Sequence, residues 1–480
     1  MSAPQRSTEQ PSHARWLDSR WLVPAVLALP FLVMVAALRG LTVTLPIFHS
    51  TDEGNYIYPT ILQFARQLPF PDLNHYVAAQ TPLFPLVEAY VGKLTGYALW
   101  TMRLVEVVIS YLLALAVYRL LERRLRLARL PALALSLLFV LSPYVFGTSF
   151  RAITDNLATL FIVLALERFE HFRENQQVGA FLAGCVALAA AMLTRQSAAF
   201  MLAVAALYAV WVGTGPTALA AAAPDEPDDR AGLALARAVA ARYSAGAFAA
   251  LRGSGLLLAV AVSAIPVGAL FLAWHGLVPP GGDPSSCALC APGRDVGATA
   301  GALVVQTPEL ALATLGLYGS LLFAPALLSA ASSARGTGYR RLAIDLRGPA
   351  VGLVLGALLL LIFPAQPGEH SAGVLWNAAK RLPTPLGSSL LFWVLVPLSG
   401  AVIAWRWRVT PHRWLLFSFL TCFLVGALAI RYPWQKYVDP FVLLALFFTV
   451  RRDELGTLRE LAGAAVLALA FIAYAVTFVT

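Results

Sequence analysis

The stretch WLVPAVLALPFLVMVAAL, residues 21–38, is followed after a short gap by HSTDEGNYIYPTIL, residues 49–62. The first stretch is an unbroken apolar run whose length suits a membrane-crossing helix. The second places two adjacent carboxylates, Asp52 and Glu53, just beyond the end of that run. Ionisable groups beside a bilayer are costly unless they are paired, hydrated or used. This pair is therefore the first candidate for a functional site.

The composition of the chain indicates a polytopic membrane protein. Its 480 residues are 59% hydrophobic and only 12% charged, and the mean hydropathy is +0.72. A water-soluble globule needs more polar surface than this. The formal net charge of +10 comes almost entirely from Arg. Because these Arg residues lie in short loops between apolar runs, the positive-inside rule explains them better than a nucleic-acid partner does.

Apolar windows of membrane-spanning length recur along the whole chain. Helices are the expected structure for such windows, because only they satisfy every backbone polar group inside lipid without closing a barrel. We predict an all-α bundle of about thirteen transmembrane helices. The windows are 21–40, 98–118, 130–147, 154–169, 178–194, 197–213, 254–274, 308–330, 349–365, 387–405, 413–430, 437–450 and 461–479.

Arg and Lys concentrate in alternate loops, which predicts a cytoplasmic N-terminal tail at 1–20 and one transmembrane domain at 21–480. The segment 214–252 then forms a cytoplasmic insertion. The predicted external loops are 41–97, 276–307, 366–386 and 431–437. Within the first of these loops, residues 55–66 and 83–94 have helical spacing but are too short to span, which suits helices lying along the membrane interface.

Taken alone, the Asp52–Glu53 pair permits two interpretations. Asp after Ser50 and Thr51 suits a helix N-terminus, where Glu53 would favour the first turn. The other interpretation is a general base at the membrane surface, which takes a proton from an acceptor hydroxyl.

Six short pieces, in this order along the chain, resemble the GT-C superfamily of polyprenyl-phosphate-sugar-dependent glycosyltransferases. More particularly, they resemble the dolichyl-phosphate-glucose α-1,2-glucosyltransferases. The chain departs from the pattern of that family at Leu83, Ser197, Ala198 and His275, so the sugar, the acceptor and the linkage stay open. The pieces are TDEGNYIYPTIL (51–62), TPLFPL (81–86), TDNLATLF (154–161), TRQSAAF (194–200), WHGLVPPGGD (274–283) and IRYPWQKYVDPF (430–441).

The resemblance implies an inverting transfer of a sugar, with glucose favoured, from a polyprenyl-phosphate donor to an acceptor hydroxyl at the external face. In this scheme Asp52 is the base and Glu53 assists it or organises the loop. The resemblance also implies a reaction without metal or other cofactor. The partners would be the lipid-linked donor, a glycan or lipid-linked acceptor and membrane lipids. The Arg- and Ala-rich composition favours a bacterial plasma membrane over the endoplasmic reticulum.

Such a donor needs cations near the leaving phosphate, because cleavage develops negative charge there. Arg195 is the first candidate, since it lies in a tight external turn between two apolar windows; a snorkelling turn arginine is the alternative. Arg431 and Lys436 follow, in an aromatic-rich turn on the side that the positive-inside rule depletes of cations.

The candidate substrate contacts are more widely spread, and each has a structural alternative. Tyr58 and Gln196 belong to pieces that carry the resemblance, and Asp283 is either a turn residue or a contact to acceptor hydroxyls. His370 and Trp376 lie in an external loop that could close over the acceptor, with sugar stacking on Trp376. An interfacial amphipathic helix also explains this loop.

Other polar residues have local explanations. Asp155 follows Thr154 at a predicted helix start and reads as an N-cap. Arg103 and Glu106 have the spacing of an ion pair on one helical face. Cys287 and Cys290 form a single CxxC in an external loop, for which we expect a local disulfide rather than zinc.

A different class of function, a membrane transporter or lipid flippase, also suits a multi-helical chain with Arg on one side. Such proteins usually carry internal repeats and paired broken helices near the bilayer midplane. Neither pattern is visible in the sequence, and the long first loop with its carboxylate pair fits an enzyme better.

Overall fold

The computed structural model describes residues 21–38, 52–213, 255–282, 304–328, 339–366, 371–430, 433–452, 454–455, 457 and 459–477. These residues are helical, as predicted, and no strand forms among them. Only one isolated bridge, between Ala372 and Trp434, joins two extended segments of the described chain.

The first half of the chain contains both long helices and short turns of helix. Its elements are α1 (Leu22–Ala37), η3 (Glu53–Ile57), α2 (Tyr58–Gln67), α3 (Leu83–Thr95), α4 (Leu99–Arg119), η4 (Leu120–Arg124), α5 (Arg129–Leu141), α6 (Pro143–Thr148), α7 (Asp155–Asn175), α8 (Val178–Thr194), η5 (Gln196–Ala199) and α9 (Phe200–Gly213).

The second half continues in the same way. Its elements are α12 (Gly255–Trp274), α13 (Gln306–Leu322), α15 (Tyr339–Ile362), α16 (Val374–Ala379), η7 (Pro385–Gly387), α17 (Leu390–Val409), α18 (Arg413–Ala427), η8 (Gln435–Tyr437), α19 (Asp439–Phe447) and α20 (Ala462–Thr477).

Three described helices are long and apolar enough to cross a membrane: Leu99–Arg124, Gly255–Trp274 and Leu390–Val409. Several shorter apolar helices accompany them, so the apolar helices support membrane association, but thirteen spans are not confirmed. The shorter helices are Leu22–Ala37, Arg129–Leu141, Val178–Thr194, Gln196–Val210, Leu346–Ile362, Arg413–Ala427 and Ala462–Ala475.

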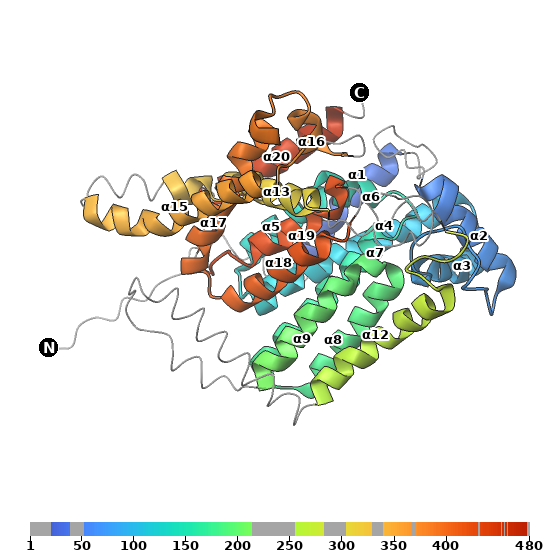
Figure 1. The fold of residues 1–480 in the computed structure, drawn as a ribbon. Coiled ribbons are helices and arrows are strands. Elements are labelled where there is room, and N and C mark those ends of the chain that lie inside the picture. The colour runs from blue at the N-terminus through green and yellow to red at the C-terminus, as the bar shows by residue number, and fades with distance from the viewer. Residues whose placement is uncertain are drawn as a thin grey trace.

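Helix α7 lies inside the bundle and packs against α4, α8 and α9 (Figure 1). The Phe169 ring lies 5.2 Å from the ring of Phe181 on α8 and 5.8 Å from that of Tyr208 on α9. Gly184 makes this approach possible, because a Cβ atom there would lie 2.5 Å from the Phe169 ring. The sequence places small residues on α8 where the large rings of its neighbours pack.

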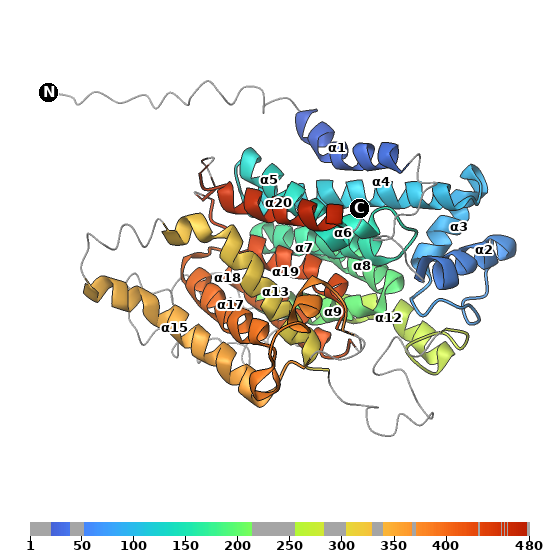
Figure 2. The ribbon, with the colours of Figure 1, turned by 90° about the horizontal axis from the view of Figure 1, so that it is seen from above.

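Helices α15 and α17 form a second close pair, which lies apart from α2 and α3 in both ribbon views (Figures 1 and 2). A Cβ atom at Gly352 would lie 2.1 Å from the carbonyl oxygen of Gly400 on the facing helix. Glycine at these positions lets the two backbones touch, which is the usual way that membrane helices gain packing contact.

The short helices α2 and α3 lie together at the end of the bundle where α4 begins (Figure 2). They confirm the helices predicted within 55–66 and 83–94. The Tyr58 hydroxyl donates to the Tyr97 carbonyl at 2.7 Å, and the Tyr90 hydroxyl donates to the Pro69 carbonyl at 3.0 Å. These bonds fasten α2 and α3 to the loops beside them.

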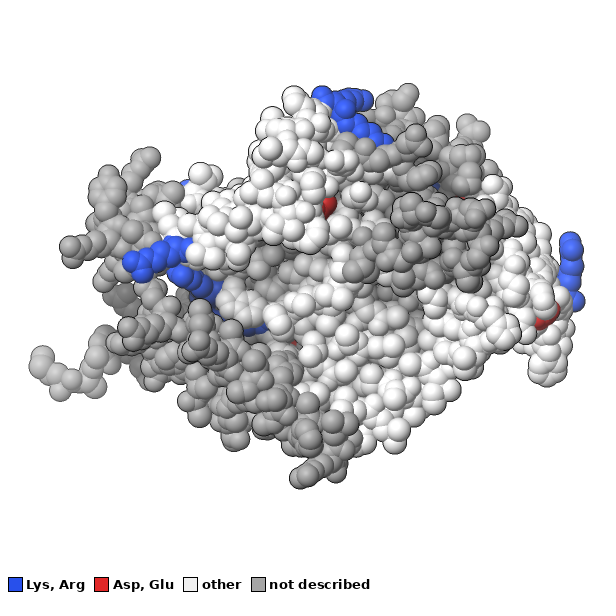
Figure 3. Space-filling model, viewed as in Figure 1, with Lys and Arg blue, Asp and Glu red and all other residues white. Residues whose placement is uncertain are grey.

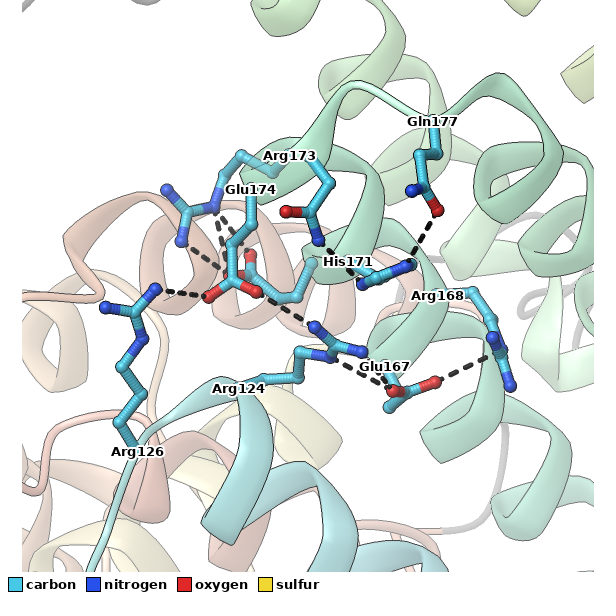
Figure 4. A network of polar contacts seen from close by, with 10 residues as sticks. Arg124, Arg126, Glu167, Arg168, His171, Arg173, Glu174 and Gln177 are labelled. Atoms are coloured by element: carbon cyan, nitrogen blue, oxygen red, sulfur yellow. Dashed lines mark hydrogen bonds and ion pairs between the residues drawn. The ribbon is translucent and has the colours of Figure 1, made fainter.

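The far end of α7 carries a network of Arg and Glu side chains (Figure 4). Arg124 at the end of η4 reaches Glu167 at 2.8 Å and Glu174 at 2.9 Å, and Arg126 reaches Glu174 at 3.3 Å. Arg124 in η4 and Arg126 just after it therefore meet the second half of α7 at this network. Helix α7 has 21 residues, so it is about 30 Å long, which is the thickness of a bilayer core. The network lies along its second half.

Charged side chains are scarce on much of the described surface in the view of Figure 3, where Lys and Arg gather mainly at the edges. Large apolar side chains are exposed instead, for example Leu258, Ile265 and Leu272 along α12. An apolar surface of this kind is expected where helices face lipid tails.

Candidate active site

Charged side chains from five separated parts of the chain meet around the start of η3. Asp52 and Glu53 come from η3 and its first flanking residue, and Arg103 comes from α4. The loop before α7 supplies Arg151, and the first residue of α7 is Asp155. The end of α8 supplies Arg195, and η8 supplies Lys436. These elements bring together residues as far as 384 positions apart in the sequence.

Asp52 is the accessible carboxylate of the pair. Its Oδ2 atom lies 2.9 Å from the Lys436 ammonium, and the two side chains are 28% and 18% exposed. Asp52 makes no side-chain cap to the helix that follows it. The capping interpretation is therefore not supported by a side-chain contact, and the role of Asp52 as the base stays a prediction.

Glu53 is placed differently, with a side chain only 5% exposed. Arg103 grips it with two hydrogen bonds, Nε to Oε1 at 3.0 Å and Nη2 to Oε2 at 2.9 Å. The backbone N–H of Ala152 donates to Oε1 at 2.8 Å. A paired guanidinium and carboxylate in this geometry make one of the stronger polar contacts in proteins. Glu53 thus ties η3 to α4 and to the loop before α7.

Arg195 and Asp155 form the second open ion pair of the site, with Nη1 and Oδ1 2.6 Å apart. The backbone of Arg195 is extended at the C-terminus of α8, which turns the side chain toward the start of α7. Burial alone would lower the pKa of Arg195, but the charge and hydrogen bond of Asp155 raise it above its ordinary value. Arg195 is therefore a permanent cation.

An aromatic wall holds the two cations near each other. The Arg195 guanidinium lies 4.8 Å from the centre of the Tyr437 ring. The Lys436 ammonium lies 4.6 Å from the centre of the Trp434 ring and 5.1 Å from that of Tyr437. Burial by itself lowers the pKa of Lys436, but the nearby Tyr437, Asp155 and Asp52 outweigh it, and the net pKa is raised. Lys436 is charged at neutral pH.

Arg151 adds a fourth cation from the loop before α7. Burial lowers its pKa to about 10, although the charges of Glu53, Asp155 and Asp52 act in the opposite direction. Arg151 is therefore still charged at neutral pH. Three carboxylates, those of Asp52, Glu53 and Asp155, face four cations among the described residues. The four cations are Arg103, Arg151, Arg195 and Lys436, so the described site carries one net positive charge.

Two predicted substrate contacts have structural partners in this state. Tyr58 donates its hydroxyl to the Tyr97 carbonyl. The Gln196 Nε2 atom donates to the Ala79 carbonyl at 2.7 Å and the Leu277 carbonyl at 3.3 Å, which joins two loops beside the site. Their roles in binding substrate stay predictions.

Trp376 lies in the short helix α16, where it is fully buried. Its indole stacks on Phe392 with ring centroids 4.6 Å apart. Stacking of a sugar on Trp376 would require this packing to open. Other predicted residues lie outside the described residues, namely Asp283, His370, Arg431 and the cysteines Cys287 and Cys290.

Two local predictions from the sequence were wrong. The ion pair of Arg103 is with Glu53 and not with Glu106, whose Oε1 accepts a hydrogen bond from Ser110 at 3.4 Å. Asp155 is the first residue of α7 and pairs with Arg195, whereas Thr154 holds the N-cap position. In both cases a long-range charge pair replaces the local contact that helical spacing suggests.

Arg151 and Arg103 are the site residues that sequence reasoning missed, as was the pairing of Arg103 with Glu53. One feature of the sequence could have indicated them: Arg103 lies within an apolar window, and Arg151 and Glu53 lie near the ends of such windows. A charged side chain in such a place needs a partner of opposite charge. Among the residues described, no group of three or more His, Cys, Asp or Glu side chains is placed to hold a metal ion. The prediction of a metal-independent reaction stays a prediction.

Comparison with known proteins supports the GT-C superfamily. Residues 79–223 match the family model described as dolichyl-phosphate-mannose-protein mannosyltransferase. The match includes Arg103, Arg151, Asp155 and Arg195, and it indicates a membrane glycosyltransferase with a polyprenyl-phosphate sugar donor. No curated protein matches the chain, and no solved structure does.

Proposed function

We propose that this chain transfers a sugar, with inversion, from a polyprenyl-phosphate donor to an acceptor hydroxyl, and that Asp52 is the base. The observation that carries the proposal is the Asp52–Lys436 contact. The partly exposed Asp52 carboxylate lies 2.9 Å from the Lys436 ammonium. Lys436 and a second cation, Arg195, both lie over the Tyr437 ring. The proposed reaction needs a base and a phosphate-binding group about one sugar ring apart. We assign the first role to Asp52 and the second to Lys436 and Arg195.

The charge balance of the site suits the proposed donor. A polyprenyl-phosphate sugar is a phosphodiester with one negative charge, and the described site carries one more cation than carboxylates. Transfer converts the phosphodiester into a monoester, which carries about two negative charges at neutral pH. Fixed cations therefore bind the leaving group more strongly as the reaction proceeds, and this lowers the barrier.

The proposed reaction assigns a role to each of these groups. The acceptor oxygen forms a bond with the anomeric carbon on the face opposite the phosphate. The bond from that carbon to the phosphate oxygen breaks, and its electron pair stays with the phosphate. Asp52 takes the proton of the acceptor hydroxyl. Glu53 is already held by Arg103 and the Ala152 N–H, so its role is to organise the loop.

The membrane arrangement supports an active site at the external face with a cytoplasmic N-terminus. Arg124 and Arg126 meet the second half of α7, which carries Arg168 and Arg173 (Figure 4). Asp155 is the first residue of the same helix. Loops rich in Arg stay on the cytoplasmic side. The site then faces outward, and a bacterial plasma membrane is the proposed location.

Glucose is the first donor sugar to test, because the six sequence pieces resemble the glucosyltransferases. Mannose is the second, since the family model that matches residues 79–223 is described as a mannosyltransferase. The acceptor is a glycan or lipid-linked hydroxyl, and both substrates reach the site from the membrane or from its outer surface.

The test is sugar transfer by the purified chain in nanodiscs. Polyprenyl phosphate carrying labelled glucose or mannose is supplied with a membrane lipid extract as acceptor, for wild type and Asp52→Asn. Label that moves to a new product only with wild type supports both the reaction and the base. Equal transfer by both proteins removes Asp52 from the chemistry. No transfer by either with any sugar donor contradicts the proposal and favours the transporter or flippase.

A further inference from the structure

A buried polar network lies directly behind Lys436 and centres on the neighbouring residue, Gln435. Gln435 is only 2% exposed. Its backbone N–H donates to the Ala372 carbonyl at 3.0 Å. Its side-chain Oε1 accepts from the Leu375 N–H at 3.1 Å and from the Tyr144 hydroxyl at 3.3 Å. Its Nε2 donates to the Tyr318 hydroxyl at 3.3 Å.

These partners come from different parts of the fold. Tyr144 lies on α6, Tyr318 lies on α13, and residues 371–375 lead into α16. The Tyr318 hydroxyl donates in turn to Asp439 Oδ1 at 2.5 Å, and the Ser142 hydroxyl donates to the other oxygen of Asp439. One amide side chain therefore joins η8 to three other elements of the bundle.

The segment before α16 approaches Gln435 so closely that only glycine fits at one position. Gly373 has φ +127°, which L side chains rarely adopt. A Cβ atom there would lie 2.5 Å from Cβ of Gln435 and 2.9 Å from the Tyr144 hydroxyl. The next residue, Val374, donates its N–H to that hydroxyl at 3.0 Å. The segment is thus docked onto the turn that carries Lys436.

The turn needs such support because it has little rigidity of its own. η8 is a 3-10 turn of only three residues, and short 3-10 turns have weak internal hydrogen bonding. Lys436 also has a long side chain that loses entropy when it is held in one place. Contacts that fix the backbone beside Lys436 therefore reduce the number of positions that its ammonium can occupy relative to Asp52.

From these contacts we infer that Gln435 is a positioning residue, which holds Lys436 at the reacting centre by docking the segment 371–375 onto η8. The inference rests on the proposed function, in which Lys436 binds the donor phosphate. Gln435 itself touches no substrate. It acts through the backbone of η8. Sugar transfer therefore requires that the segment 371–375 is correctly docked.

The test is a double-mutant cycle on the rate of sugar transfer, with labelled polyprenyl-phosphate sugar as donor in nanodiscs. Gln435→Ala in the wild-type background is expected to lower kcat/KM for the donor by about tenfold to a hundredfold, the effect of a misplacement of about 1 Å. In the Lys436→Ala background the same change is expected to have almost no further effect, because its route to the chemistry is gone. Gly373→Ala, which pushes the segment away, is expected to behave like Gln435→Ala.

Thermal unfolding of the same proteins separates positioning from general destabilisation. Tyr208→Phe is the matched control, because it removes another buried hydrogen bond, to Glu170, at the other end of α7. It is expected to lower the apparent Tm with kcat/KM unchanged. If the double variant loses kcat/KM by the product of the two single losses, the two residues act independently. That result would overturn the inference about Gln435 but not the proposed function. Wild-type transfer by Lys436→Ala would overturn the proposed phosphate site and the inference together.

Discussion

Replacement of each adjacent carboxylate by its amide is expected to affect a different property. Glu53→Gln should lower stability, whereas Asp52→Asn should lower the rate of sugar transfer. Glu53→Gln keeps the shape of the side chain but removes the charge that faces Arg103 in a buried pair, with exposures of 5% and 6%. Removing one partner of a buried ion pair costs about 3–5 kcal/mol, because the other charge is left buried without compensation. The free energy of unfolding should fall by this amount.

Asp52→Asn should have a much smaller effect on stability. The Asp52–Lys436 pair is partly exposed, with 28% and 18% of the side chains accessible. Pairs near the surface contribute about 0–1 kcal/mol, and the Asn oxygen can still accept a hydrogen bond from Lys436. The same change removes the proposed base, and loss of a general base lowers a rate by about 10²–10⁴-fold. Asp52→Asn is therefore expected to lower activity with little loss of stability, in contrast to Glu53→Gln.

The assay measures both quantities on one preparation of each protein in nanodiscs. Apparent Tm is followed by thermal unfolding, and transfer is followed with labelled donor below the lowest Tm. We expect Asp52→Asn to unfold near wild type and to transfer little sugar, and Glu53→Gln to unfold at clearly lower temperature. A wild-type Tm for Glu53→Gln would refute the role given to the Arg103 contact. Equal destabilisation by both changes would refute the distinction between the two carboxylates.

Three other changes test separate features of the structure. Arg195→Ala should raise KM for the donor by about tenfold or more, since one charge-assisted contact to phosphate contributes about 1.5–3 kcal/mol. Asp155→Asn leaves Arg195 in place and should retain more donor affinity. Competition by inorganic or lipid phosphate measures the affinity of both variants. Burial raises the pKa of Glu88 from 4.5 to about 8, so the folded state binds an extra proton between these values, and stability is expected to fall as pH rises through this window. The apparent Tm of Glu88→Gln should then exceed that of wild type at pH 8 but not at pH 4.5, and parallel pH profiles would contradict this. Gly352→Ala forces a Cβ atom to within 2.1 Å of a facing carbonyl oxygen and should cost about 1–3 kcal/mol by overpacking; Gly268→Ala, where no atom lies within 4 Å, is the control and should keep the wild-type Tm.

Several parts of the fold were predictable because their signals are local. Apolar runs of sufficient length predict helices in lipid regardless of what they pack against. The helices at 55–66 and 83–94 were likewise predictable from spacing, and both form. The number of membrane spans was harder to predict. The sequence of a shorter apolar helix such as Arg129–Leu141 does not show whether that helix crosses a bilayer.

The candidate site was predictable only in its individual residues. Asp52, Arg195 and Lys436 stood out because each is an ionisable residue in a place where charge is costly. Their assembly was not visible, since Lys436 and Asp52 are 384 positions apart. Nothing in local periodicity specifies which ends of which helices meet.

The apolar helical chain, a sidedness predicted from the arginines, and a few ionisable residues in costly places can all be read from the sequence alone. The partners of those ionisable residues depend on how the helices pack. Arg103 has Glu106 three residues away, yet it pairs with Glu53, which offers two carboxylate oxygens in a buried fork geometry. A helical neighbour contributes only a few tenths of a kcal/mol, whereas a buried charge without a partner costs several. Burial is a property of the assembled bundle, and it therefore outweighs local spacing in choosing the contacts that build this site.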